Sequence, residues 1–178
     1  MQPDNIANDY LKRNRISLLA TGSEILQGET LDSNCQHFAH KIHQKGGILF
    51  QHLQTSDTLS EILQGVAYLL KHSDALIICG GLGPTSDDNT RFALSEYTQL
   101  PLTLNAQAWS HIKMRLKQFD LPLASSNRKQ ALFPSDATLY INSFGTACGC
   151  KVLWKNKTIF LLPGPPRECI PMFEQQVL

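Results

Sequence analysis

The segment from Gly80 to Thr90 constrains the fold of this chain more than any other. It follows five apolar residues, Ala75–Cys79, a run short enough to be a buried strand. Three of the next four residues are glycines, so the backbone can turn sharply and approach a ligand without a Cβ atom in the way. Asp87 and Asp88 follow, just before a stretch with a helical pattern. A glycine turn, a helix N-terminus and two carboxylates together indicate a phosphate site with a metal ion.

The chain before this turn alternates between strand and helix patterns. Strands are predicted for residues 16–20, 48–54 and 75–79. The intervening helices are expected to begin at Asp32 or Ser33, and at a capping box formed by Thr58 and Glu61. This alternation predicts an α/β fold with a parallel sheet flanked by helices. Ligands of such sheets gather at the carboxyl ends of the strands, where three loops of this chain should converge.

The second half of the chain carries further elements and a loop of small residues. Helices are predicted for residues 89–97 and 106–119, with Trp109, Ile112, Leu116 and Phe119 of the latter in the core. Residues 125–130 are a turn with a short helix, and residues 138–141 are a strand. A hairpin joins residues 151–154 to 158–162, and a last helix begins at about Arg167. That helix has no stop signal, which leaves open whether the chain is a fragment of something longer.

Composition narrows the class of protein. The length of 178 residues favours one domain, which we place at residues 15–178 after a flexible leader at residues 1–14. Lys plus Arg number 16 and Asp plus Glu number 15, so no excess charge indicates a nucleic-acid partner. No apolar run approaches the roughly 20 residues that span a bilayer, and no signal-peptide core is visible. We therefore expect a cytoplasmic protein that binds no membrane and keeps its five cysteines as free thiols.

Five stretches resemble the N-terminal domain of the competence/damage-inducible (CinA) family, within the molybdopterin-binding superfamily of MoaB, MogA and gephyrin. They are ATGSEILQGETLDSN (Ala20–Asn34), CGGLGPTSDDNT (Cys79–Thr90), SNRKQALFP (Ser126–Pro134), NSFGTACG (Asn142–Gly149) and LLPGPPRECIPMF (Leu161–Phe173). The NRKQA and PGPP stretches indicate the CinA branch. The chain departs from the family pattern at Cys148, where proline is usual, at Cys169, where methionine is usual, and at Ser23, where threonine is common.

The resemblance implies a fold, an assembly and an activity. It implies a three-layer α/β/α sandwich with a mostly parallel central sheet, assembled as a homo-oligomer, either a dimer or a trimer. In the CinA branch this domain is associated with metal-dependent hydrolysis of ADP-ribose to AMP and ribose 5-phosphate. Full-length relatives add a C-terminal nicotinamide-mononucleotide deamidase domain, which this sequence lacks, so we do not expect that second activity.

Cleavage of a diphosphate requires neutralised phosphate charge, an activated water and a stabilised leaving group. A divalent ion such as Mg²⁺, Mn²⁺ or Co²⁺ serves all three needs, and K⁺ is a further candidate cofactor. The superfamily spacing from the glycine turn makes Asp88 the first choice for metal binding or water activation. Asp87 and Glu24 are further metal ligands, and Asp57 and Arg128 complete the catalytic set. A P-loop is excluded, because that motif needs a lysine after its glycines, whereas this turn carries aspartates.

Substrate-binding residues are expected on all the converging loops. The backbone N–H groups of residues 81–85 would hold phosphate oxygens, and the loops at residues 145–147 and 164–166 would enclose the nucleotide or pterin. The predicted substrate-binding residues are Gly22, Gly80, Gly81, Gly83, Pro84, Thr85, Asn127, Lys129, Gly145, Thr146, Gly164 and Pro165.

Each of these assignments has an alternative without chemistry. Asp87 and Asp88 could cap the next helix, Asp57 and Glu24 could be loop acids, and Arg128 with Lys129 could be surface cations. Two other functions also remain open. One is a molybdopterin-binding or adenylyl-transferring protein of molybdenum cofactor biosynthesis, and the other is a binding domain without turnover. In all three cases the partner is a small-molecule nucleotide or pterin.

Overall fold

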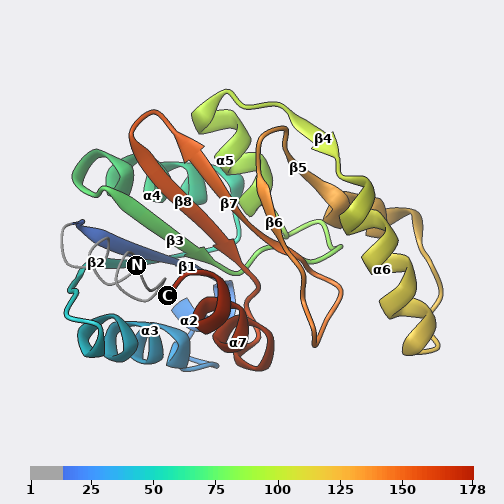
Figure 1. Cartoon of the computed structure of the whole chain (residues 1–178), viewed down its shortest axis with the longest axis horizontal. Coiled ribbons are helices and arrows are strands. Elements are labelled where there is room, and N and C mark those ends of the chain that lie inside the picture. The colour runs from blue at the N-terminus through green and yellow to red at the C-terminus, as the bar shows by residue number, and fades with distance from the viewer. Residues whose placement is uncertain (1–13) are drawn as a thin grey trace, which may run out of the picture.

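The centre of the molecule is a mixed six-stranded sheet, seen in a computed structural model that describes residues 14–178. Its strands are β1 (Ile16–Thr21), β2 (Leu49–Thr55), β3 (Ala75–Cys79), β6 (Thr138–Tyr140), β7 (Gly149–Trp154) and β8 (Lys157–Leu162), in the order β2-β1-β3-β8-β7-β6 (Figure 1). The first four strands of that order pair in parallel, whereas β7 pairs antiparallel with both of its neighbours, β8 and β6. The predicted α/β fold with a mostly parallel sheet is confirmed. The predicted leader lies, except for its last residue, outside the described residues.

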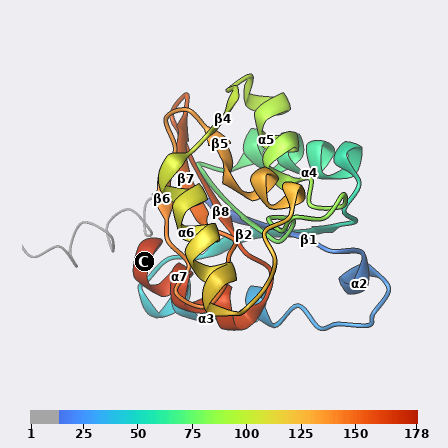
Figure 2. The same cartoon turned by 90° about the vertical axis from the view of Figure 1, so that its right-hand side faces the viewer.

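Helices cover both faces of this sheet (Figures 1 and 2). One face packs on α3 (Ser33–Gln44) and α7 (Pro166–Gln176), and the other packs on α4 (Leu59–His72), α5 (Thr90–Thr98) and α6 (Ala106–Gln118). Successive side chains of a strand point to opposite faces of the sheet, so each strand contributes to the hydrophobic core on both faces. Leu18 faces α3 and α7, whereas Leu19 faces α4. The result is the three-layer sandwich that the resemblance implied. No helix within residues 14–178 combines the length and the apolar character needed to cross a bilayer.

Three short elements complete the fold: α2 (Ser23–Leu26), the 3₁₀ helix η1 (Ser125–Ala131), and a separate two-stranded sheet of β4 (Leu102–Leu104) and β5 (Leu132–Pro134). We did not predict the small sheet, because three-residue strands carry too little alternation to be seen in a sequence. Phe119 was expected in the core but is 45% exposed. It lies just beyond the last residue of α6, where the helical stripe no longer determines its direction.

The two predicted helix starts had different outcomes. Asp32 caps α3, and its side chain accepts a hydrogen bond from the Cys35 N–H at 2.9 Å, as expected. The capping box at Thr58 is wrong, because the Thr58 side chain makes no capping bond to α4. Its hydroxyl lies 3.0 Å from the Ser56 hydroxyl, and Glu61 accepts from the Ser56 N–H at 3.2 Å. Ser56 thus competes for both groups of the predicted box.

The register of the parallel strands brings their carboxyl ends to one level. Thr21 at the end of β1 pairs with Thr55 of β2, and Cys79 at the end of β3 pairs with Ala20 of β1 and Leu162 of β8. The loops that follow these four strands therefore leave the sheet side by side. This is the edge at which open α/β sheets bind their ligands.

Candidate functional site

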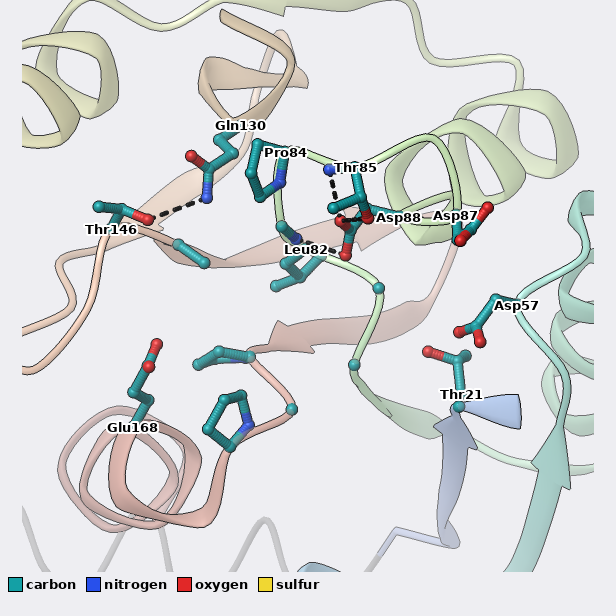
Figure 3. Close-up of a pocket in the computed structure, with 18 of the residues that line it drawn as sticks. Thr21, Asp57, Leu82, Pro84, Thr85, Asp87, Asp88, Gln130, Thr146 and Glu168 are labelled. Atoms are coloured by element: carbon teal, nitrogen blue, oxygen red, sulfur yellow. Dashed lines mark hydrogen bonds between the residues drawn. The ribbon is translucent and has the colours of Figure 1, made fainter. Parts of the chain in front are cut away.

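A cavity of about 400 Å³ lies at this edge of the sheet (Figure 3). The loops after β1, β2, β3 and β8 all contribute, together with Gln130 of η1 and Thr146 from the loop between β6 and β7. Such a volume falls in the range of small-molecule sites. The predicted convergence of separate loops on one crevice is therefore found, and the Gly80–Asp88 turn forms one wall of it.

The glycines of that turn are required by its geometry. Gly80 has a φ of 106° and Gly81 a φ of 66°, values that side chains rarely tolerate. A Cβ atom on Gly80 would also overlap with the carbonyl oxygen of Thr21, and one on Gly81 with the Thr90 hydroxyl. The Thr90 hydroxyl donates to the Gly80 carbonyl at 2.8 Å and closes the turn onto the start of α5.

Asp88 organises the turn from inside. Its carboxylate accepts hydrogen bonds from the Gly83 N–H at 2.6 Å and the Thr85 N–H at 2.8 Å, and from the Thr85 hydroxyl (Figure 3). Two of the amides that we expected to face phosphate therefore hold this carboxylate, and Pro84 has no N–H. Within residues 14–178, the N–H groups of Gly81 and Leu82 have no protein acceptor. Among the amides of residues 81–85, these two are therefore the ones without a protein acceptor.

A buried cation supports the same turn from behind. Arg91 is 1% exposed and donates through Nη2 to the Leu82 carbonyl at 3.0 Å, with its guanidinium 4.9 Å from the centre of the Phe133 ring. Burial lowers the pKa of Arg91 to about 10, so the side chain stays charged at neutral pH. Lys129 donates to the Thr85 carbonyl at 2.6 Å. Two positive charges therefore lie next to a turn that carries the carboxylates of Asp87 and Asp88 and has N–H donors without a protein acceptor in the described part of the chain.

The four carboxylates that we predicted, those of Glu24, Asp57, Asp87 and Asp88, all line the cavity. Asp57 accepts from the Ser23 N–H at 2.8 Å, which ties the loop after β2 to the loop after β1. In Figure 3, Asp57 and Asp87 border the same open space. Within the described part of the chain, no three of the four lie as close together as ligands of one ion would. Oxygen donors spread in this way still fit Mg²⁺, which keeps several waters and takes one or two carboxylates together with substrate phosphates.

Glu168 on the opposite wall was missed by sequence reasoning. It lies in the first turn of α7, lines the cavity and is 9% exposed. Asn142 holds it by donating to its Oε2 at 2.7 Å, while the Asn142 Oδ1 accepts from the N–H groups of Phe144 and Gly145, both at 2.9 Å. A Cβ atom on Gly145 would overlap with the Glu168 carboxylate, so this glycine is needed for close packing. Glu168 stands inside the matched LLPGPPRECIPMF stretch, but no local pattern marks it as a cavity residue.

The Gly164 turn on this wall is attached to α3, which packs on the same face of the sheet as α7. Asn34, in the first turn of α3, donates to the Gly164 carbonyl at 2.8 Å and lies 3.2 Å from the Cys79 sulfur. The Cys79 and Cys169 sulfurs lie 3.3 Å apart beneath the turn, and burial raises the pKa of the Cys169 thiol. Contacts among residues distant in the sequence thus determine where Gly164 and Pro165 stand.

Several predicted residues lie outside the cavity. Gly145 and Asn127 line an adjoining groove of about 640 Å³, whose apolar wall includes Leu116, Phe119 and Phe144. Lys129 contacts the Thr85 carbonyl of the turn but does not line the cavity. The structure does not bring Arg128, which is exposed, to either the cavity or the groove.

The other predicted residues, Gly22, Gly80, Gly81, Gly83, Pro84, Thr85, Thr146, Gly164 and Pro165, do line the cavity. Gln130, a lining residue that we did not predict, donates to the Thr146 hydroxyl at 3.0 Å and joins two loops of the cavity wall.

The known proteins with similar sequences are CinA-like proteins and members of one domain family. Residues 17–178 match a family described as "Probable molybdopterin binding domain". A "Putative competence-damage inducible protein" of Alkaliphilus metalliredigens is 38% identical over 164 residues, which are 92% of this chain and 40% of that protein. A "CinA-like protein" of Citrifermentans bemidjiense is 37% identical with the same coverage. The chain thus spans about 40% of the length of these relatives.

Solved structures agree with the sequence matches. The protein CinA of Thermoplasma acidophilum, described as having unknown function, superposes with a TM-score of 0.84 at 27% identity, over 92% of this chain and 99% of that chain. The tungsten cofactor synthesizing protein MoaB of Pyrococcus furiosus superposes with a TM-score of 0.59 at 13% identity, over 92% of this chain and 89% of that chain. The second likeness concerns the fold alone.

Proposed function

The chain belongs to the CinA-like branch of the molybdopterin-binding domain family, and on this premise we propose that it hydrolyses a nucleotide diphosphate, cleaving ADP-ribose to AMP and ribose 5-phosphate. One observation carries the proposal: Gly81 and Leu82, whose N–H groups have no protein acceptor within residues 14–178, line the same cavity as five carboxylates. A diphosphate needs both kinds of group, since N–H donors bind its oxygens and carboxylates bind its counter-ion.

The glycine turn binds the diphosphate in this proposal. The N–H groups of Gly81 and Leu82 donate to nonbridging phosphate oxygens, and the Arg91 charge behind Leu82 strengthens that contact. Asp88 acts on the turn itself, because its carboxylate already satisfies Gly83 and Thr85 and keeps the loop in one conformation. Asp88 therefore positions donors, which differs from the direct catalytic role expected from the superfamily spacing.

Asp57, Asp87 and Glu24 are the residues that would hold a divalent ion such as Mg²⁺, Mn²⁺ or Co²⁺. Such an ion, when bound, neutralises phosphate charge and lowers the pKa of a bound water. Asp57 is the best positioned of the three, since the Ser23 N–H fixes its Oδ2 at 2.8 Å. On the opposite wall, Glu168 and Thr146 offer an acceptor and a hydroxyl to the ribose groups of the substrate.

The test is direct incubation of the pure protein with ADP-ribose and Mg²⁺, Mn²⁺ or Co²⁺, followed by detection of AMP and ribose 5-phosphate. We expect Asp57→Asn and Asp87→Asn to lower kcat/KM by about 100-fold, the scale of losing one catalytic contact. Asp136→Asn is the matched control, because Asp136 is an exposed carboxylate that does not line the cavity. Absence of AMP with every metal, or undiminished turnover in Asp57→Asn, would remove the hydrolase assignment.

The groove beside the cavity supports a second candidate. Its apolar residues Leu116, Phe119 and Phe144 would accept a flat ring, and a pterin fits that description as well as an adenine does. Under this alternative the protein binds molybdopterin or transfers an adenylyl group to it. Saturable binding of molybdopterin without release of AMP from ADP-ribose would favour this function. Thermal stabilisation by ADP-ribose without any product would instead indicate a binding domain without turnover.

A further inference from the structure

A compact group of unlike side chains lies away from the cavity. Asp32, Cys35 and His52 each offer one metal-ligating atom, and the three atoms lie within 4.8 Å of one another. Within residues 14–178, no other three His, Cys, Asp or Glu side chains have their ligand atoms this close together. None of the three residues lines the cavity. Asp32 precedes α3, Cys35 lies in the first turn of α3, and His52 is in β2.

The three donors are a thiol sulfur, an imidazole nitrogen and a carboxylate oxygen, which are the donor types of protein zinc sites. Two ligands about 2.1 Å from a tetrahedral zinc ion lie roughly 3.4 Å apart, so small side-chain adjustments would bring these atoms into range. The His52 Nε2 already lies 2.9 Å from the Asp32 Oδ2. An ion pair accounts for those two side chains, but it does not account for the thiol beside them.

The surroundings orient the cluster. The Asp32 Oδ1 accepts from the Cys35 N–H at 2.9 Å, which directs Oδ2 toward His52. Gln54 donates to that Oδ2 at 3.4 Å, and the Asp32 side chain is 7% exposed. His52 is held by the parallel ladder between β1 and β2, and its side chain is 26% exposed, so an ion can reach it. Hydrogen bonds of this kind to ligating carboxylates are what orients metal ligands in known sites.

We propose that Asp32, Cys35 and His52 form a zinc-binding site with a fourth position open to water. The site is distinct from any ion held by the cavity carboxylates, because a thiolate favours zinc whereas Mg²⁺ takes oxygen donors. It joins β2 to the start of α3, and Asn34 in that helical turn donates to the Gly164 carbonyl at 2.8 Å. Zinc at this position therefore stabilises the helix end that holds the Gly164 turn, and the inference does not depend on the proposed hydrolase activity.

The experiment is a zinc titration of the whole chain by calorimetry, with cobalt as a spectroscopic probe. We expect one tight zinc site, a melting temperature that rises with zinc concentration, and a thiolate-to-cobalt charge-transfer band in the cobalt spectrum. Cys35→Ser and His52→Gln should each weaken zinc binding by at least about 100-fold, and Cys35→Ser should abolish the band. His40→Gln is the matched control, because His40 lies on the same helix and bonds to Gln44.

The outcomes separate this site from the cavity. Loss of zinc binding in Asp57→Asn but not in Cys35→Ser would place the ion in the cavity and overturn the proposal. A cobalt spectrum without a charge-transfer band, or zinc binding that survives both Cys35→Ser and His52→Gln, would overturn it as well. The serine variant keeps the size of Cys35, which is only partly buried, and its melting temperature in the metal chelator EDTA checks that it folds.

Discussion

The two walls of the cavity are held in different ways. The wall formed by residues 80–90 is braced mainly from within, by the carboxylate of Asp88 and the hydroxyl of Thr90. The wall formed by residues 163–168 is braced from afar, by Asn142, which is 26 residues from Glu168, and by Asn34, which is 130 residues from Gly164. We refer to them as the local wall and the remote wall.

The two walls should differ in how much stability a substitution removes. The hydrogen bonds of Asp88 to Thr85 are exposed, so water can replace much of what a substitution removes. The Asn142 bonds to Ala147 and Glu168 are buried, so their loss leaves polar groups without partners. Removal of a hydrogen-bonding side chain should therefore destabilise the protein more in the remote wall. Replacement of a glycine by alanine should destabilise it more in the local wall.

The largest expected effect is that of Gly80→Ala. The new Cβ atom would overlap with the Thr21 carbonyl, at a residue whose φ is 106°, and we expect a loss of about 3 kcal/mol in the free energy of unfolding. Gly164→Ala is the matched variant in the remote wall. Its nearest neighbour would lie 3.5 Å away, and we expect a change within about 0.5 kcal/mol. Urea unfolding measures both free energies. Equal losses in the two variants would contradict the expectation that glycine replacements destabilise the local wall more than the remote wall.

Asn142→Ala tests the side-chain bracing of the remote wall. Asn142 is 1% exposed and makes four hydrogen bonds, with Phe144, Gly145, Ala147 and Glu168. We expect a loss of about 2 kcal/mol, because buried donors and acceptors are left unpaired. Asn156→Ala, at the exposed turn between β7 and β8, should change the free energy of unfolding by less than about 0.5 kcal/mol. An Asn142→Ala protein as stable as Asn156→Ala would show that the remote wall needs no such brace.

Asp88→Ala tests the corresponding brace of the local wall. We expect a loss of about 1 kcal/mol, less than for Asn142→Ala, because water reaches the freed N–H of Thr85. Asp87→Ala is the neighbouring control, since the Asp87 carboxylate accepts one hydrogen bond, from the adjacent Ser86 hydroxyl at 3.2 Å. Thermal unfolding of both variants gives the difference, and a greater loss for Asp87→Ala would contradict the assignment of Asp88 as the brace.

The smallest expected effect is a pH dependence of the free energy of unfolding that comes from the pair of Asp32 and His52. This pair lies at the start of α3, the helix that carries Asn34. The hydrogen bond to Asp32 raises the pKa of His52 from 6.5 to about 9. A raised pKa contributes stability that is fully present below about pH 6.5 and is lost as pH rises through about 9. Because the His52 side chain is 26% exposed and solvent screens the pair, we expect less than about 1 kcal/mol. Unfolding in EDTA at pH 6 and pH 10 should show this loss in the native sequence and in His40→Gln, but not in His52→Gln.

Much of the fold was accessible from the sequence because it depends on neighbouring residues. The strands β1 and β3, the cap at Asp32 and the need for glycine at residues 80 and 81 all follow from local patterns. The capping box at Thr58 failed for an equally local reason, since Ser56 binds the same groups. The order of the loops also predicted that Glu24 and Asp57 would meet the glycine turn in one crevice.

The remaining features of the site depend on contacts that no local pattern records. Glu168 lines the cavity because Asn142 and Gly145 pack against it, and Arg91 supports the turn because Phe133 and Leu82 surround it. Arg128, which looks like a phosphate ligand in the sequence, is exposed and lines neither the cavity nor the groove, whereas Gln130 of the same 3₁₀ helix lines the cavity.

The sequence by itself determined the elements, their order and the chemistry of the loops at the sheet edge. Only the tertiary structure decided which groups remain free to bind. Asp88 takes the amides of Gly83 and Thr85, so Gly81 and Leu82 are left to donate. The physical reason is that a hydrogen-bond donor has one partner at a time, and the folded geometry of the turn, which residue types alone do not specify, determines which partner that is.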